Sequence, residues 1–356
     1  ASTSPAHTMI AATHNHAGPA IVTIGPYGRD DAYLRWLKEA VADMAADAVA
    51  RLQPAEIGIS SAFEARYCHN RRWVTRDGGV VTQPGVANPD VLYCEGPVDT
   101  ELGVLCARDA DGAVLGYVAN WTCHPVHPYD MRTVTASWPG ALSRSVRERE
   151  GVPCVVLNGA FGNVHTAHWI DPAYVDDPDR IGEALAASVG ATREDMDFGA
   201  DVPLGASSEL LEVPLRDIPP EVLAWANATV SGGDAPSPAG SQRYGQDITY
   251  ARAVLQLAER KRERDFSRAE IQALRVGDAV FVGLPAEAFV ETGLLIKVAS
   301  AFRRTFVVGA VNGMVGYAPP PDNYARGGYE CTTAMWSKVD PKAADMMAYA
   351  GIRLAA

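Results

Sequence analysis

The chain has 356 residues, of which 47% are hydrophobic and 21% are charged, and these proportions are typical of a globular protein with a large core. Its formal net charge of −12 and the lack of a Lys/Arg-rich run argue against nucleic-acid binding, and no apolar stretch is long enough to span a membrane. Six widely spaced cysteines without a Cys-x-x-Cys pair favour reduced thiols. With no signal peptide visible, we expect a cytoplasmic protein, and secretion is the alternative.

The first motif follows a short apolar run at residues 9–12, which predicts the end of a buried strand. The next residues read Thr-His-Asn-His-Ala-Gly-Pro, and Gly18–Pro19 would break the strand. His14 and His16 are two residues apart, so on a strand they would point to the same face. Such a pair fits a metal or catalytic site, but it also fits two structural histidines held by hydrogen bonds.

Residues 31–52 predict an amphipathic helix, because apolar residues recur there at spacings of three and four. Asp30 is suited to cap its start, and Pro54 follows its end. Residues 57–63 predict a strand. The polar segment that follows contains Arg71 and Arg72, for which a solvated surface pair is the alternative to a functional role.

A hairpin is predicted from residues 102–107 and 114–121, and its second strand leads into Thr-Cys-His-Pro-Val-His-Pro. A helix to about residue 150 and a strand at 154–157 follow. Six of the eight histidines come just after predicted strands: His14, His16, His124, His127, His165 and His168. Because three separate strand ends carry them, we expect one common site, as in open α/β sheets.

The second half predicts helices at 177–191, 219–230 and 247–264, with an exposed loop or lid rich in Gly, Pro and Ser at 231–243. A hairpin at 270–284 leads to Glu287 and a helix to about residue 302. A strand at 305–311 precedes Tyr317, and a helix at 342–354 closes the chain. We therefore predict a mixed α/β fold in a single large domain over residues 1–356. A mixed central sheet would be flanked by helices, with the site at strand ends.

Imidazoles and a carboxylate are ligands that suit zinc, so a catalytic zinc site assembled by folding is one interpretation of these residues. The segment from His14 to Pro19 also resembles the Thr-His-Thr-His-Ser-Gly-Pro motif of the neutral, non-lysosomal ceramidases. Further segments resemble that family in the same order: residues 70–72, 120–125, 162–164, 284–287, 316–317 and 329–330. This resemblance covers nearly the whole chain and implies a short, bacterial-type catalytic domain without the family's C-terminal immunoglobulin-like domain.

The resemblance implies one zinc ion held by four ligands from separate segments: His14, His124, Glu287 and Tyr317. It implies His16 as a proton-handling residue beside the metal, and Arg71 and Tyr329 as the residues that hold the oxyanion. The alternatives are a helix N-terminal carboxylate for Glu287 and packing at the edge of the core for the two tyrosines.

Two positions depart from the family pattern. The family's serine is replaced by His165, and the acidic residue before a later Pro-Gly turn is absent from the sequence Ala-Ser-Trp-Pro-Gly at 136–140. These departures favour a soluble, polar amide over long-chain ceramide as the substrate. They also favour direct attack by zinc-activated water without an acyl-enzyme, with His16 or His165 moving the proton.

The function that we expect is therefore that of a zinc-dependent amidohydrolase that cleaves a linear carbon–nitrogen bond in a small molecule. An esterase or lactonase using the same zinc site is the alternative among enzymes. A non-catalytic metal-binding scaffold is the alternative from another class. Association with a second copy of the chain is left open.

The start of the chain differs from that of family members, which carry a substantial segment before the first histidine motif. Strands in that segment would pair with the sheet that carries His14, and without them a sheet edge would be bare. We therefore expect Ala1 to be a proteolytically processed terminus, with an N-terminal fragment that stays associated as a separate chain.

Overall fold

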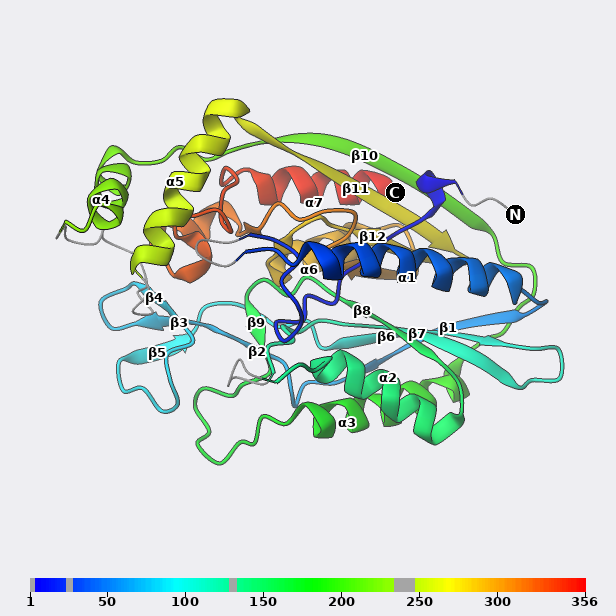
Figure 1. Ribbon diagram of the computed structural model, residues 1–356. Coiled ribbons are helices and arrows are strands. Elements are labelled where there is room, and N and C mark those ends of the chain that lie inside the picture. Colours follow the sequence, from blue (N-terminus) through cyan, green and yellow to red (C-terminus); the bar gives the residue numbers. More distant parts are fainter. Residues whose placement is uncertain (1–3, 24–27, 128–132, 234–246) are drawn as a thin grey trace.

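Two four-stranded mixed sheets lie at the centre of the computed structural model, which describes residues 4–23, 28–127, 133–233 and 247–356 (Figure 1). The first sheet has the strand order β1 (Glu56–Phe63), β6 (Glu101–Arg108), β7 (Val114–Trp121) and β8 (Cys154–Asn158). The second has the order β10 (Leu204–Pro214), β11 (Phe266–Val276), β12 (Ala279–Gly283) and β14 (Arg304–Val308). Each sheet contains one parallel pair, β7–β8 or β12–β14, and its other pairs are antiparallel.

The two sheets pack face to face. The ring of Phe306 on β14 occupies the space that a Cβ atom on Gly103 of β6 would need, so only glycine permits this approach. The side-chain amide of Asn120 on β7 donates to the carbonyl of Val307, at 3.1 Å. The predicted mixed α/β class is confirmed, and the one sheet that we expected is divided into two packed sheets.

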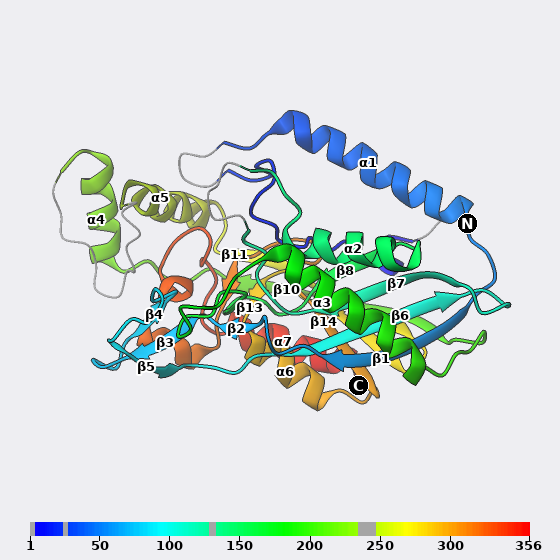
Figure 2. The same cartoon turned by 90° about the horizontal axis from the view of Figure 1, so that it is seen from below.

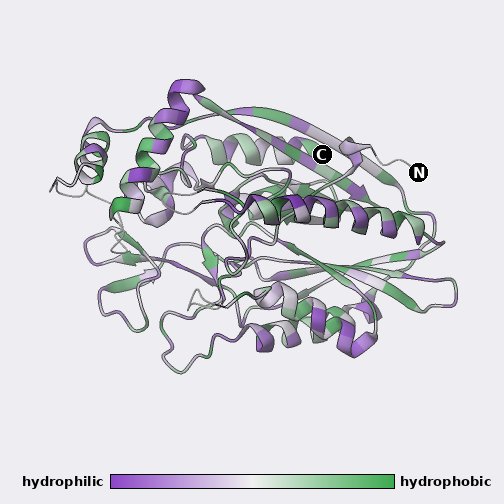
Figure 3. Ribbon diagram, in the orientation of Figure 1, coloured by the Kyte–Doolittle hydropathy of each residue, from purple (hydrophilic) through white to green (hydrophobic). Residues whose placement is uncertain are grey.

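Helices cover the outer faces of both sheets. On the first sheet, α2 (Ser137–Glu150) and α3 (Pro178–Ala191) bury Trp138, Leu142 and Ile181 against strand residues (Figure 2). On the second sheet, α6 (Val290–Ala299) and α7 (Ala343–Leu354) pack in the same way. Strands β12 and β14 are nearly continuous apolar runs because they are covered on both faces, whereas β10 mixes hydrophobic and hydrophilic residues and is largely exposed (Figure 3).

Helix α1 (Asp31–Ala50) forms where the sequence predicts it, and the Asp30 carboxylate caps it by accepting from the amide of Tyr33 at 2.9 Å. None of its residues is buried, and Figure 2 shows it standing apart from the rest of the chain. The apolar residues that made the helix pattern, such as Met44 at 65% exposure, therefore do not contribute to the described core.

Two expectations for local structure need correction, and one long strand was missed. The strand predicted at 9–12 is reduced to a single bridge between Ala11 and Val311. The helix predicted to follow Glu287 begins at Val290, because the residues before it form a short strand. Strand β10 was not predicted, since its exposed residues break the alternation that signals a half-buried strand.

The rest of the chain forms short elements and one further helical pair. Helices α4 (Pro220–Val230) and α5 (Asp247–Glu263) pack together, and the predicted lid at 231–243 between them lies outside the described residues from 234 onward. A three-stranded sheet contains β3 (Arg72–Thr75), β4 (Val80–Thr82) and β5 (Val91–Cys94). Among the described residues, 3-10 turns span Pro5–His7, Thr192–Asp195, Pro321–Arg326 and Tyr329–Cys331. Within the described ranges, no helix is both long and apolar enough to cross a membrane.

Candidate metal centre

The candidate residues meet at the carboxyl ends of the parallel strand pairs of the two sheets. His124 follows β7, and Phe161 follows β8, the strand parallel to it. Glu287 follows β12 on the short strand β13 (Glu287–Ala288). Tyr317 follows β14 on β15 (Tyr317–Ala318), which pairs with β13 in parallel so that Glu287 lies opposite Tyr317. The side chains predicted to lie at strand ends are thus brought to one place from both sheets.

His14 reaches this place from an irregular segment and not from a strand. Its φ of 64° lies in the left-handed region, which is costly for a residue with a side chain. The carbonyl of neighbouring Thr13 accepts from the Asn158 side chain at 3.1 Å, and the amide of His16 donates to the Pro125 carbonyl at 3.2 Å. The prediction of a strand here is wrong, but the rings of His14 and His16 still lie 4.8 Å apart, measured between their centroids.

The Glu287 carboxylate faces two imidazoles. Its Oε2 lies 3.2 Å from Nε2 of His14 and 3.3 Å from Nε2 of His124, and the Tyr317 hydroxyl lies 3.5 Å from the same His124 nitrogen. Nevertheless, this buried Oε2 makes no hydrogen bond within the part of the chain that the structure describes. A buried carboxylate oxygen without a hydrogen bond is costly, unless a cation satisfies it.

The protonation states of His124 and Glu287 also favour a cation at this position. Nδ1 of His124 contacts the Phe161 carbonyl at 2.8 Å, so Nδ1 carries the proton and Nε2 presents a lone pair. Burial and the nearby Arg71 charge hold the pKa of His124 well below its ordinary value. Burial opposes ionisation of Glu287, but opposing contributions, of which the nearby His14 is the largest, hold its pKa well below the usual range. The lone pair of His124 therefore faces a carboxylate, an arrangement that a bound cation would stabilise.

The spacing of the donor atoms fits a zinc ion. With zinc–nitrogen and zinc–oxygen bonds of about 2.0–2.1 Å, two ligand atoms of a tetrahedral site lie about 3.3 Å apart. The three separations between donor atoms at this site, 3.2, 3.3 and 3.5 Å, are close to that value. The ring nitrogens of His14, His16 and His124 also lie within 4.8 Å of one another, so His16 is at the same centre.

Arg71 is held by the paired strands β2 (His69–Asn70) and β9 (Val164–His165), and its amide donates to the Asn163 carbonyl. Its Nη2 donates to the Tyr317 hydroxyl at 3.0 Å and to the Gly162 carbonyl at 2.8 Å, and its Nε donates to Glu330 at 2.8 Å. Its Nη1 has no acceptor among the described residues. Because both Arg71 and Arg72 are buried, their interpretation as a solvated surface pair is wrong.

Glu330 is the residue of this site that sequence reasoning missed. It is fully buried, and its Oε1 accepts from Arg71 while its Oε2 accepts from Arg72 at 2.7 Å and from Thr82 at 2.8 Å. Two adjacent arginines could have signalled it, because buried guanidinium groups require a buried carboxylate partner. Glu330 fixes Arg71, which in turn fixes the hydroxyl of Tyr317.

The remaining predicted residues surround the cluster. The Tyr329 ring lies 5.5 Å from the Tyr317 ring, edge to face, and burial and the Glu287 charge hold the pKa of Tyr329 well above its usual value. His16 is exposed at the edge of the cluster, and desolvation and the nearby His14 lower its pKa to about 4. His165 is buried and its backbone forms a bridge with His124. Its Nδ1 accepts from the amide of Ala167, so its proton is on Nε2.

Gly162 is essential to the assembly of the site, because a Cβ atom there would run into the carbonyl oxygens of Glu287 and Ala288. These are backbone atoms that cannot move without shifting β13. We expect Gly162→Ala to lower the free energy of unfolding by about 1–3 kcal/mol and to weaken zinc binding, as measured by urea denaturation and zinc titration. Gly199→Ala is the control, since a Cβ atom there meets nothing within 4 Å. Equal effects of the two substitutions would contradict this role.

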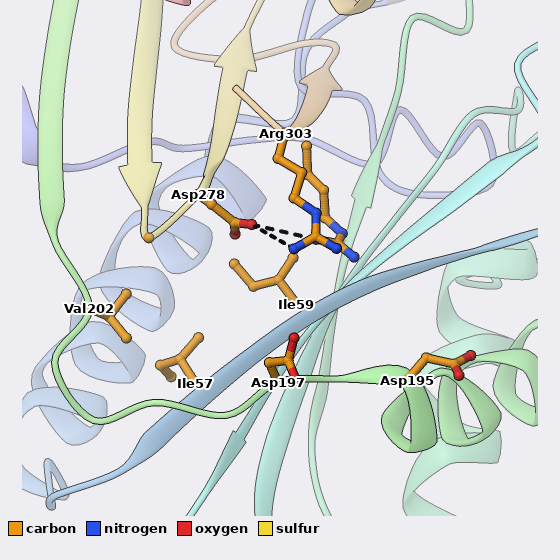
Figure 4. A pocket seen from close by; sticks show the side chains of 9 residues that line it. Ile57, Ile59, Asp195, Asp197, Val202, Asp278 and Arg303 are labelled. Carbon is orange, nitrogen blue, oxygen red and sulfur yellow. Dashed lines mark ion pairs between the residues drawn. The ribbon is translucent and has the colours of Figure 1, made fainter. Parts of the chain in front are cut away.

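A small cavity of about 90 Å³ lies elsewhere, beside Asp278, which directly precedes β12 (Figure 4). Arg304, the first residue of β14, also lines it. The cavity is thus at the amino ends of the strands whose carboxyl ends lead to the histidine cluster. Asp278 lies 3.7 Å from Arg303 and 3.6 Å from Arg304 there, and Asp195 and Asp197 also line the cavity. No histidine lines it, so it lacks the donor set of the candidate metal centre.

Comparisons with known proteins give a structural relationship only. No protein-family model and no curated protein sequence matches the chain. The crystal structure of neutral ceramidase from Pseudomonas aeruginosa is similar over 98% of this chain, with a TM-score of 0.69 and 18% identity. A structure of ceramidase complexed with C2 is similar over 98%, with a TM-score of 0.68 and 18% identity. The chain spans 60% and 61% of these two proteins, respectively. The chain therefore has a neutral ceramidase-like fold.

Proposed function

We propose that the chain is a zinc-dependent amidohydrolase that cleaves the carbon–nitrogen bond of a small, polar amide. The observation that carries this proposal is the convergence of the Glu287 carboxylate with the imidazoles of His14 and His124 at the spacing of zinc ligands. The neutral ceramidase-like fold, whose named relatives act on an amide lipid, supports the reaction class. Tyr317 is the fourth ligand in this proposal, since its hydroxyl adjoins His124.

A bound zinc ion would polarise the substrate carbonyl and lower the pKa of a water molecule to about 7. His16 is at the rim of the cluster, where its lowered pKa of about 4 keeps it neutral near pH 7 and able to accept a proton. His165 is the second candidate for proton transfer, because it is neutral and its Nε2 carries the proton.

Two donors are suited to stabilise negative charge on the substrate oxygen. Tyr329 keeps its phenolic proton, since its pKa is raised well above its usual value. Arg71 keeps its charge, and its Nη1 is not used by another described residue, while its Nη2 donates to Tyr317 and Gly162 and its Nε to Glu330. Donors fixed in place before the reaction stabilise the developing charge without reorganisation.

The experiment that tests this function is hydrolysis of a panel of small amides and matching esters, before and after removal of metal. We expect amide hydrolysis that is lost with a chelator and restored by zinc. Faster hydrolysis of the esters, with no activity on amides, would instead support an esterase or lactonase. Tight zinc binding with neither activity would support a scaffold protein and reject the proposed enzyme.

Tyr329→Phe removes one proposed oxyanion donor but keeps the aromatic ring. We expect kcat to fall by about two to three orders of magnitude, with zinc content unchanged, because such a donor contributes roughly 3 kcal/mol in the transition state. Steady-state kinetics with elemental analysis would measure both quantities. Tyr93→Phe is a control, since Tyr93 is 55% exposed on β5. If kcat for Tyr329→Phe equals that of the wild type, the Tyr329 hydroxyl does not take part in the mechanism.

A further inference from the structure

A second group of reactive side chains adjoins the metal centre without belonging to it. Nδ1 of His127 lies 3.1 Å from the Ser137 hydroxyl, and Nε2 of His127 lies 2.8 Å from Oδ1 of Asp176. The Thr166 hydroxyl donates to the other carboxylate oxygen of Asp176 at 3.1 Å. Ser137, His127 and Asp176 therefore form a continuous serine–histidine–carboxylate chain.

The proton positions in this serine–histidine–carboxylate chain follow from the hydroxyl and the carboxylate on either side of the imidazole. A carboxylate only accepts hydrogen bonds, so Nε2 of His127 carries the ring proton and donates a hydrogen bond to Asp176. Nδ1 then presents a lone pair, which accepts a hydrogen bond from the Ser137 hydroxyl. This is the arrangement in which an imidazole can take a proton from serine while a carboxylate orients the ring and stabilises its charged form.

The backbone of Ser137 is also unusual. Ser137 is the first residue of α2, and its φ of 52° lies in the left-handed region, which is strained for any residue except glycine. Its own amide donates to the Thr135 hydroxyl at 3.2 Å, and the amide of Gly140 donates to the Ala136 carbonyl. The amide of Trp138 has no acceptor among the described residues, so the residue after the serine offers a donor for an oxyanion at a helix N-terminus.

We propose that Ser137 is a nucleophile for acyl transfer, activated by His127 and oriented through Asp176. Ser137 Oγ would attack the carbonyl carbon of an ester or activated amide while its proton moves to His127 Nδ1. That proton would leave with the alcohol or amine, which gives an acyl-serine. Water would then attack the acyl group, pass a proton to Nδ1 and release the carboxylic acid, and the proton would return to Ser137. Because Ser137 is only 3% exposed, the acyl group must be small.

This site is distinct from the proposed zinc site in its chemistry, although the two are close in space. The amide of Thr135, two residues before Ser137, donates to the Ala17 carbonyl at 3.1 Å, and the Asn15 side chain donates to the Thr135 carbonyl. The segment that carries His14 and His16 is thus bonded to the segment that carries the serine. No step of the serine chemistry requires a metal, so this inference goes beyond the proposed function.

The test is labelling of the full chain by methanesulfonyl fluoride, a small reagent for activated serines, with and without prior removal of metal by a chelator. In this reaction a bond forms between Ser137 Oγ and sulfur, the serine proton passes to His127, and fluoride leaves. We expect peptide mapping by mass spectrometry to find the label on Ser137 in both samples. No label on wild-type Ser137 would overturn the proposal without affecting the zinc hypothesis, which depends on metal-dependent amide hydrolysis.

Three variants separate a nucleophile from a structural serine. Ser137→Gly keeps the backbone free of strain at positive φ, so it should fold and lose the label. Ser145→Ala, which removes another buried hydroxyl from the same helix, should be labelled like the wild type. Asp176→Asn should slow labelling on the order of 10³- to 10⁴-fold, because the imidazole loses its orientation. Wild-type labelling rates in Asp176→Asn, or a persistent label in Ser137→Gly, would contradict the relay.

Discussion

Replacement of His124 by alanine is expected to abolish both zinc binding and amide hydrolysis. Its Nε2 lies 3.3 Å from the Glu287 carboxylate and presents a lone pair there, because Nδ1 carries the ring proton and donates it in a hydrogen bond to the Phe161 carbonyl. Without the ring, the cluster loses a buried donor that no other described residue can replace from the same position. Elemental analysis of protein purified without chelators, followed by an amidase assay, would measure both losses.

His7→Ala is the matched control for this substitution, since His7 is an exposed histidine in the same chain. It should keep the zinc content and the activity of the wild type. Retention of zinc by His124→Ala would place the metal elsewhere, and retention of amidase activity without zinc would separate the reaction from the metal.

Glu330→Gln is expected to give the largest loss of stability. The amide keeps the size of the side chain, and Arg72 keeps its second partner Glu95, but Arg71 loses the carboxylate that neutralises it in a fully buried position. Leaving a buried charge without its partner costs about 3–5 kcal/mol. The free energy of unfolding, from urea denaturation at neutral pH, measures this cost.

The pH dependence of stability tests the same network. Burial would raise the pKa of Glu330, but Arg71 and Arg72 outweigh it and lower that pKa. The carboxylate therefore contributes stability that is fully present above the ordinary glutamate pKa and is lost as the pH falls through the lowered folded value. This acid-induced loss should be smaller in Glu330→Gln.

An exposed ion pair provides the control for this substitution. Glu209 pairs with Arg353, and the Arg353 side chain is 57% exposed. Because exposed pairs contribute about 0–1 kcal/mol, Glu209→Gln should change stability by less than that amount. Similar losses for Glu330→Gln and Glu209→Gln would show that the buried network does not carry the stability that we assign to it.

Local patterns were sufficient to predict most helices and, apart from β10, the strands of the two four-stranded sheets. The cap at Asp30, the hairpin that turns at Gly277 and the apolar run of β14 all act within a few residues, so the sequence shows them directly. The order of motifs also placed His124 and Glu287 at strand ends. Both residues follow strands, and the ends of those strands can be located from the periodicity of hydrophobic residues.

The features that were not predicted depend on contacts between distant residues. Arg71 and Glu330 are separated by 259 positions in the sequence, and neither segment signals burial by its composition. The left-handed backbone of His14 follows from tertiary hydrogen bonds, since no glycine marks the position. The contact between His127 and Asp176 likewise joins two irregular segments, which have no periodicity to reveal it.

The most direct test of the zinc hypothesis is a crystal structure of protein purified without chelators, with anomalous diffraction measured on both sides of the zinc absorption edge. The proposed site predicts one zinc peak per chain, bonded to His14, His124, Glu287 and Tyr317. The contradicting result is the absence of zinc from this position, with the Glu287 carboxylate hydrogen-bonded directly to a protonated His14.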